Sequence, residues 1–66
     1  MSIEYKKLWI LLIQKGVSKQ QLRMKAELSS ATMTKLNKNQ FVSMEILVRI
    51  CRALDCNIGD IVDIIK

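Results

Sequence analysis

The sequence predicts an all-α domain, a compact bundle of five short helices. Apolar residues recur at the i, i+3, i+4, i+7 spacing of amphipathic helices, the segments between them are brief, and proline is absent. The 66 residues are enough for one domain, residues 1–66. A domain of this size buries only about 60% of its unfolded surface, which leaves little room for a deep pocket and argues against an enzyme.

The first two helices are predicted at residues 3–15 and 18–25. The first carries an apolar stripe at helical spacing, made of Tyr5, Leu8, Trp9 and Leu12. Gly16 follows as a residue able to take the left-handed conformation that ends many helices. The second helix starts with an S-x-x-Q capping box, in which the Ser18 side chain caps the helix and Gln21 reaches back to it.

The third and fourth helices are predicted at about residues 29–37 and from Ser43 onward. Ser29 or Ser30 caps the third helix, which follows the turn Ala26–Leu28, and Ser43 caps the fourth. The inner sides of the two helices are expected to carry Met33 and Leu36 in the third, and Leu47, Ile50, Cys51 and Leu54 in the fourth. Residues 38–42 are expected to form a loop between them.

A fifth helix is predicted after Asn57. Asp60 would occupy its N3 position, where a carboxylate interacts favourably with the positive end of the helix dipole. Its apolar stripe would be Ile58, Ile61, Val62 and Ile65. Because every predicted helix has one apolar side, we expect the helices to pack around one core.

The positive charge is concentrated in the first two-thirds of the chain. The net charge is +5, yet residues 1–40 hold eight basic and two acidic residues, whereas residues 41–66 hold three basic and four acidic ones. The first part therefore carries +6 and the second −1. This asymmetry indicates a polyanionic partner at one end of the domain, against the alternative of a generally basic protein.

The composition predicts no metal or cofactor site. The chain has two cysteines and no histidine, whereas a structural zinc site needs four ligands. We expect Cys51 to be a buried small hydrophobic residue and Cys56 to be a free thiol in a loop. The longest apolar run, Leu8–Ile13, is too short for a membrane span or a secretory signal, so we expect a cytoplasmic protein with no membrane partner.

Residues 18–36 are predicted to form a helix-turn-helix, two short helices joined by a tight turn. The side chains expected to set the crossing of these helices are Leu22, Leu28, Met33 and Leu36. The outward face of the second helix carries small, hydroxyl and lysine side chains, namely Ser30, Ala31, Thr34, Lys35 and Lys38. Such a face can enter a DNA major groove about 12 Å wide. A role in capping the helix is enough to explain why Ser29 and Thr32 are polar, but it explains less well why Thr34 and Lys35 continue the polar face.

With these residues the chain resembles the Cro/repressor-type helix-turn-helix family, the lambda-repressor-like DNA-binding domains, and most of all its small stand-alone bacterial and phage regulators. The segments that carry the resemblance are "LLIQKGVSKQQL", the turn "AELS", "SSATMTKLNKN" and "SMEILVRICRALDCNIGDI". They extend over essentially the whole chain. The resemblance implies a five-helix lambda-repressor-like bundle and a transcription regulator, most often a repressor, that binds a palindromic operator in double-stranded DNA as a homodimer.

The resemblance also implies a role for each matching position. The third helix is the recognition helix, and its base-contacting residues are Ser30, Ala31, Thr34 and Lys35. The residues that would contact phosphate are Lys19, Gln20, Lys38, Asn39, Gln40 and Ser43. No catalytic residue, cofactor, metal or small-molecule ligand is implied.

Two positions depart from the family pattern. Arg23 stands where a small alanine is common, so its side chain must point outward or the helix crossing must shift. Glu27 stands where the turn usually has glycine. A left-handed conformation at that position costs a residue with a side chain about 1–2 kcal/mol.

Three function classes remain to be compared. For a dimeric regulator, some of the apolar residues outside the core stripes, together with the fifth helix, are expected to line the dimer interface: Ile10, Leu11 and Ile64. The alternative is that these are ordinary exposed aliphatic side chains, which are common on protein surfaces. The same fold could instead serve as a protein–protein adaptor, such as an antitoxin or anti-repressor, although an adaptor needs no basic face. A membrane-active basic peptide is the third class, and the helical stripes that require a folded core argue against it.

Overall fold

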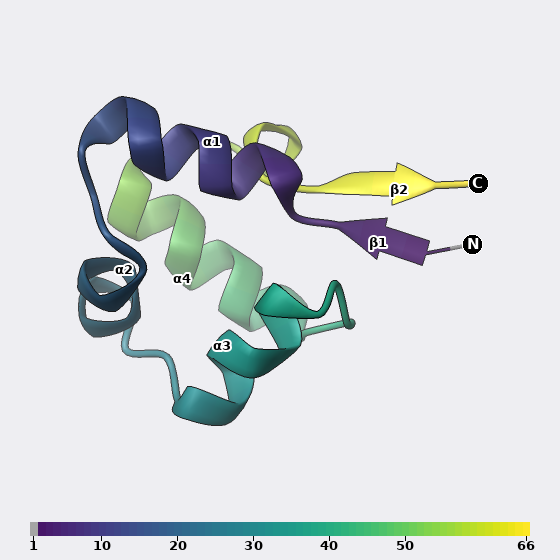
Figure 1. Cartoon of the computed structure of the whole chain (residues 1–66), viewed down its shortest axis with the longest axis horizontal. Coiled ribbons are helices and arrows are strands. Elements are labelled where there is room, and N and C mark those ends of the chain that lie inside the picture. Colours follow the sequence, from purple (N-terminus) through teal and green to yellow (C-terminus); the bar gives the residue numbers. More distant parts are fainter. Residues whose placement is uncertain (1) are drawn as a thin grey trace.

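Four α-helices and a two-stranded antiparallel sheet make up residues 2–66, the part of the chain that the computed structural model describes (Figure 1). In chain order the elements are β1 (Ser2–Glu4), α1 (Lys6–Lys15), α2 (Lys19–Lys25), α3 (Ser30–Asn37), α4 (Met44–Leu54), the 3-10 turn η1 (Ile58–Asp60) and β2 (Asp63–Ile65). The first four predicted helices are therefore confirmed, and the prediction of a fifth is wrong.

The segment predicted as the fifth helix is a single 3-10 turn followed by a strand. β2 pairs with β1 in the antiparallel register Ser2 with Ile65, Ile3 with Ile64 and Glu4 with Asp63. In the predicted stripe, Ile61 is fully buried, whereas Ile58 and Ile65 are exposed. The β-branched residues that follow Asp60 favour extended backbone. Because β1 uses residues 2–4, α1 begins at Lys6 and not at Ile3.

The predicted helix ends are set by local chemistry. The side chains of Ser18, Ser29 and Ser43 each accept a hydrogen bond from the backbone N–H three residues later, at 3.1, 3.1 and 3.2 Å. The Ser18 N–H in turn donates to Gln21 Oε1 at 2.8 Å, which completes the predicted capping box. Gly16 ends α1 with φ +67°, a conformation that glycine adopts without steric cost.

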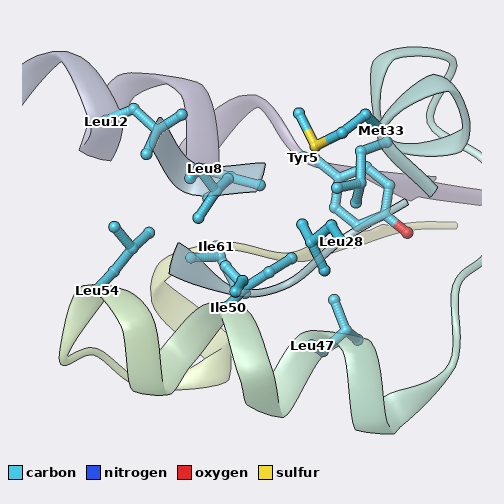
Figure 2. Close-up of a cluster of buried hydrophobic side chains, with 12 residues drawn as sticks. Tyr5, Leu8, Leu12, Leu28, Met33, Leu47, Ile50, Leu54 and Ile61 are labelled. Atoms are coloured by element: carbon cyan, nitrogen blue, oxygen red, sulfur yellow. The ribbon is translucent and has the colours of Figure 1, made fainter. Parts of the chain in front are cut away.

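The core lies between α1, the helix-turn-helix and α4. Figure 2 shows Leu8 and Leu12 of α1 pointing toward Ile50 and Leu54 of α4. The buried side chains are Tyr5, Leu8, Leu12, Leu22, Ala26, Leu28, Met33, Leu36, Leu47, Ile50, Leu54 and Ile61. This set includes all four residues predicted to set the helix crossing. Burial of each large aliphatic side chain contributes about 1.5–3 kcal/mol.

Two residues expected in the core, Trp9 and Cys51, are only partly buried and pack against it. Cys51 and Cys56 are both free thiols, and Cys56 lies, half-buried, in the loop between α4 and η1, as predicted. Burial, followed by the neighbouring Cys51 thiol, raises the pKa of Cys56 to about 11. None of the helices in residues 2–66 has the length and apolar character needed to cross a membrane.

Candidate nucleic-acid interface

The eight residues of α3 divide into a buried side and an exposed side. Met33 and Leu36 face the core, whereas Ser30, Ala31, Thr34 and Lys35 are all exposed. The four exposed positions follow the spacing that places side chains on one face of a helix. α3 lies at the edge of the molecule opposite α1 (Figure 1). The predicted base-contacting residues therefore share one solvent-facing surface.

Hydrogen bonds within α3 limit what its hydroxyl groups can offer to a partner. The Ser29 hydroxyl caps the helix and donates to Thr32 Oγ1 at 3.0 Å, so this pair is used in capping. Thr34 Oγ1 donates to the Ser30 carbonyl at 3.0 Å. With its proton committed, Thr34 can present an acceptor lone pair and a methyl group.

Lys19 lies where three helices meet. Its Nζ atom donates to Asn37 Oδ1 at the end of α3, at 2.8 Å, and lies 4.2 Å from the centroid of the Trp9 ring on α1. A cation over an indole face is attracted by the ring quadrupole. Both contacts hold the Lys19 ammonium group beside the C-terminal end of α3, near Lys35 and Lys38.

Gln20 is held by Arg23, which stands where the family commonly has alanine. Arg23 Nε donates to Gln20 Oε1 at 3.3 Å, along the surface of α2. The Arg23 side chain is thus turned outward, the first of the two options that the sequence allowed. Because Gln20 Oε1 accepts this bond, its NH₂ group is the part of the amide left to donate to a partner.

The loop after α3 is anchored by Tyr5. Asn39 has a left-handed backbone with φ +54°, and its Oδ1 accepts a hydrogen bond from the Tyr5 backbone N–H at 3.2 Å. The hydroxyl of Tyr5, a fully buried residue, donates to the Gln40 carbonyl at 2.7 Å. The Gln40 N–H donates to the Lys35 carbonyl at 2.9 Å. Asn39 and Gln40, two of the three residues in this loop that are predicted to contact phosphate, therefore also hold the loop in its conformation.

The turn between α2 and α3 contains a strained residue. Glu27 has φ +56°, so the left-handed conformation considered from the sequence is present. The Glu27 carbonyl accepts from Arg49 Nη1 at 3.4 Å, which ties the turn to α4. Its side chain is exposed.

A family profile described as Cro/C1-type HTH DNA-binding domain matches residues 7–66, nearly the whole chain. The chain belongs to this family. Its structure is also similar to the crystal structure of the transcriptional regulator VanUg, Form II, with a TM-score of 0.92 and 42% sequence identity, over 94% of this chain and 83% of that chain. A comparison with curated proteins finds no match.

In this Cro/C1-type domain the lysines around α3 are not neutralised by nearby acids. The ion pairs found within residues 2–66 join Lys7 to Asp63 and Arg49 to Glu45. Lys19, Lys35 and Lys38 take part in neither. A cluster of positive charge without carboxylate partners attracts a polyanion at short range, and the attraction is weakened by salt.

Three residues that were not predicted to belong to the interface organise this Cro/C1-type surface. Trp9 and Asn37 position the Lys19 ammonium group, and Tyr5 holds the loop after α3. The contacts join residues that lie 18 to 35 positions apart in the chain, except for Trp9 and Lys19. No helical or strand periodicity indicates such pairs. Asn37 alone carried a sequence signal, because it is a polar residue at the end of a predicted helix.

Proposed function

We propose that this chain is a sequence-specific double-stranded DNA-binding transcription regulator, a repressor, that reads the major groove with α3 as a homodimer. The observation that carries the proposal is the exposed face of α3, whose small and hydroxyl side chains lie beside Lys19, Lys35 and Lys38, which take part in neither ion pair found within residues 2–66. The similarity to a protein described as a transcriptional regulator supports the same class.

Each exposed residue of α3 has a physical role in this proposal. Ser30 and Ala31 are small enough for the start of the helix to approach the base edges closely. The Thr34 methyl group packs against a thymine methyl, and its free lone pair accepts from an exocyclic amine. Lys35 donates to guanine O6 or N7.

The phosphate contacts follow from the groups left free in the structure. Lys19 and Lys38 contribute positive charge at the C-terminal end of α3. Gln20 donates through its NH₂ group, since its oxygen is bonded to Arg23. Asn39 likewise donates through its NH₂ group, and Gln40 adds an exposed side chain beside it. Ser43 caps α4, whose first N–H groups point toward solvent and bind an anion.

Dimerisation increases the number of base pairs that the protein contacts. One α3 reaches only a few base pairs, and two copies on a palindrome place their recognition helices about 34 Å apart. Of the three residues expected at the interface, Ile10 and Ile64 are exposed, whereas Leu11 is partly buried against the core. Bound at a promoter, the dimer represses by excluding the transcription machinery from the same DNA.

The first test is selection of duplexes from a random DNA pool, carried out at two salt concentrations. We expect an inverted repeat whose half-sites lie about one helical turn apart. Enrichment of no sequence, with weak binding that is lost at moderate salt, would leave only a basic surface. The proposal would then fail in favour of an adaptor that binds another protein.

Single substitutions then assign the roles. Thr34→Ala and Lys35→Ala should each weaken binding to the selected site by about 1–3 kcal/mol and relax the sequence preference. Lys38→Ala should weaken binding to all sequences alike and reduce the salt slope by about one. Lys66→Ala is the matched control, because this exposed lysine lies beyond β2 and should leave both quantities unchanged.

A further inference from the structure

Exposed apolar side chains gather on the side of α4 that faces away from the core. The most exposed are Phe41 at 70%, Met44 at 63%, Val48 at 48%, Ile58 at 41% and Ile64 at 65%. They come from the segment before α4, the outer face of α4, η1 and β2. We call this set the apolar face. Contiguous exposed apolar surface of this kind is uncommon on monomeric proteins and marks an interaction site.

The apolar face is hollowed along its length. One hollow of about 270 Å³ lies between the sheet and the start of α4, and its lining is almost entirely apolar. A second hollow of about 500 Å³ continues along α4 toward η1. Met44, Leu47 and Ile58 line both. The two hollows therefore form one groove that can receive side chains from a partner.

The charges at the edge of the groove favour a partner with the same surface. Arg52 and Asp55 line the second hollow, and neither takes part in the ion pairs found within residues 2–66. A two-fold interface brings the same patch from both copies together, so that residue i meets residue j and residue j meets residue i. One unpaired cation and one unpaired anion on the same edge satisfy this requirement. The charges of Arg52 and Asp55 cancel and no lysine of residues 2–66 lines the groove, so the groove has no excess positive charge to attract a polyanion or an anionic membrane.

The position of the apolar face also fits the DNA geometry. Recognition helices about 34 Å apart lie about 17 Å from the two-fold axis. The described chain measures 30 by 23 by 18 Å, so the face on the axis must lie close to α3. Phe41 follows the end of α3 by four residues, and the loop after α3 and both strands lie at the same end of the molecule (Figure 1). The exposed Ile10 and Ile13 belong to α1, on the opposite side from α3 (Figure 1).

We infer that a second copy of this chain covers the apolar face in a two-fold dimer, in which Phe41 and Met44 enter the partner's groove and Arg52 pairs with the partner's Asp55. The inference rests on the proposed function, which requires two copies on one operator. In this dimer the two copies meet mainly through α4, η1 and β2, and not through Ile10 and Leu11 of α1, which were expected at the interface from the sequence.

The test compares variants by sedimentation equilibrium in the absence of DNA. Phe41→Glu and Ile64→Glu should each raise the dimer dissociation constant by about 100-fold or more, because each dimer buries the side chain twice and central interface residues are typically worth about 30-fold or more each. Ile13→Glu is the matched control, since Ile13 is 80% exposed on α1 and should leave the dimer unchanged. Circular dichroism verifies that all three variants remain folded.

Two results would overturn the inference. One is a wild-type chain that stays monomeric both alone and on palindromic DNA. The other is a Phe41→Glu chain that dimerises as tightly as wild type. Failure of the proposed function is a different outcome, because the monomeric Phe41→Glu chain should still bind a single half-site with the wild-type salt slope per copy. A dimer that binds no DNA would refute the function and leave the interface intact.

A charge exchange tests the two-fold pairing. Arg52→Glu and Asp55→Lys should each weaken the dimer, because each places like charges opposite one another at two symmetric points. An equimolar mixture of the two variants should form a heterodimer, detected by native mass spectrometry, because both pairs are then opposite in sign. Thermal melts verify that each variant is folded. A mixture that associates no better than its components would refute the pairing of Arg52 with Asp55.

Discussion

Replacement of Glu27 with glycine should stabilise the domain. Glu27 has φ +56°, where a side chain clashes with the backbone at a cost of about 1–2 kcal/mol. Glycine carries no such penalty, but it increases the conformational entropy of the unfolded chain, which offsets about 0.4–1 kcal/mol. The hydrogen bond from Arg49 Nη1 goes to the Glu27 carbonyl and survives the change. The net gain is therefore roughly 0.5–1 kcal/mol.

The assays are thermal and urea denaturation, each followed by circular dichroism and by fluorescence of Trp9, the single tryptophan of the chain. For a domain of 60–100 residues, 1 kcal/mol corresponds to a shift in Tm of about 4–8 °C. Glu27→Gly should therefore melt roughly 2–8 °C above wild type. The slope of unfolding free energy against urea should not change, since the folded surface is the same.

Two controls separate backbone strain from charge. Glu27→Gln removes the carboxylate but keeps the side chain, so it should give none of the gain. Glu27 lines a surface hollow together with Lys25 and Arg49, and attraction between exposed charges of this kind contributes about 0–1 kcal/mol. Asn39→Gly should destabilise the domain, because asparagine tolerates the left-handed region and its side chain accepts from Tyr5. If Glu27→Gly is no more stable than Glu27→Gln, strain at this turn is refuted.

Three further predictions follow from individual contacts. Tyr5→Phe leaves the Gln40 carbonyl without its buried donor and should cost about 1–2 kcal/mol in urea denaturation; an unchanged midpoint would show that the bond contributes nothing. The Cys56 pKa is raised by burial from 9.0 to about 11, so its contribution to stability is complete below pH 9.0 and is lost as the pH rises toward 11. Melts across this range should show the decline, and a Cys56→Ala chain should show less of it. Asn37→Ala removes the hydrogen bond that holds the Lys19 side chain in place. The side chain then loses its conformational entropy only when DNA binds, so DNA affinity should fall about 2- to 10-fold. The salt slope should stay the same in Asn37→Ala and fall by about one in Lys19→Ala, and equal slopes in the two variants would contradict the assigned roles.

The first four helices could be predicted because their signals are local. Ser18, Ser29 and Ser43 each cap a helix through a bond to a residue three positions away, and this spacing is visible in the sequence. The i, i+3, i+4 stripes of α1 and α4 place apolar residues on one side whatever the tertiary structure is. Gly16 marks the end of α1 for the same reason, since its conformation depends on its own backbone.

The ribbon of β1 and β2 could not be predicted in the same way. The run Ile61–Ile65 has apolar residues at spacings that suit one side of a helix, and short apolar runs do not distinguish helix from strand. What decides the conformation is the backbone pairing with Ser2–Glu4, about sixty residues earlier. A window of local sequence contains no sign of that partner.

The exposure of the residues in the candidate interface could be predicted from the sequence, whereas their hydrogen-bond partners could not. The exposed positions of α3 follow from helical periodicity alone. The hydrogen bonds of the Asn39 and Lys19 side chains do not, because they join residues 34 and 18 positions apart in the chain. Sequence spacing therefore identified which residues lie on the surface, and only the structure shows which of their atoms are already bonded.

The pairing of β1 with β2 has a consequence for the order in which the chain folds. The contact between α2 and α4 spans only one intervening helix, whereas Ser2 must meet Ile65 across nearly the full chain. Closing so long a loop has an entropic cost that is recovered only when the intervening core is in place. The ribbon is therefore the last element to form and the first to open. Its backbone amides should exchange with solvent deuterium well before those of α4, through openings that leave the helices intact.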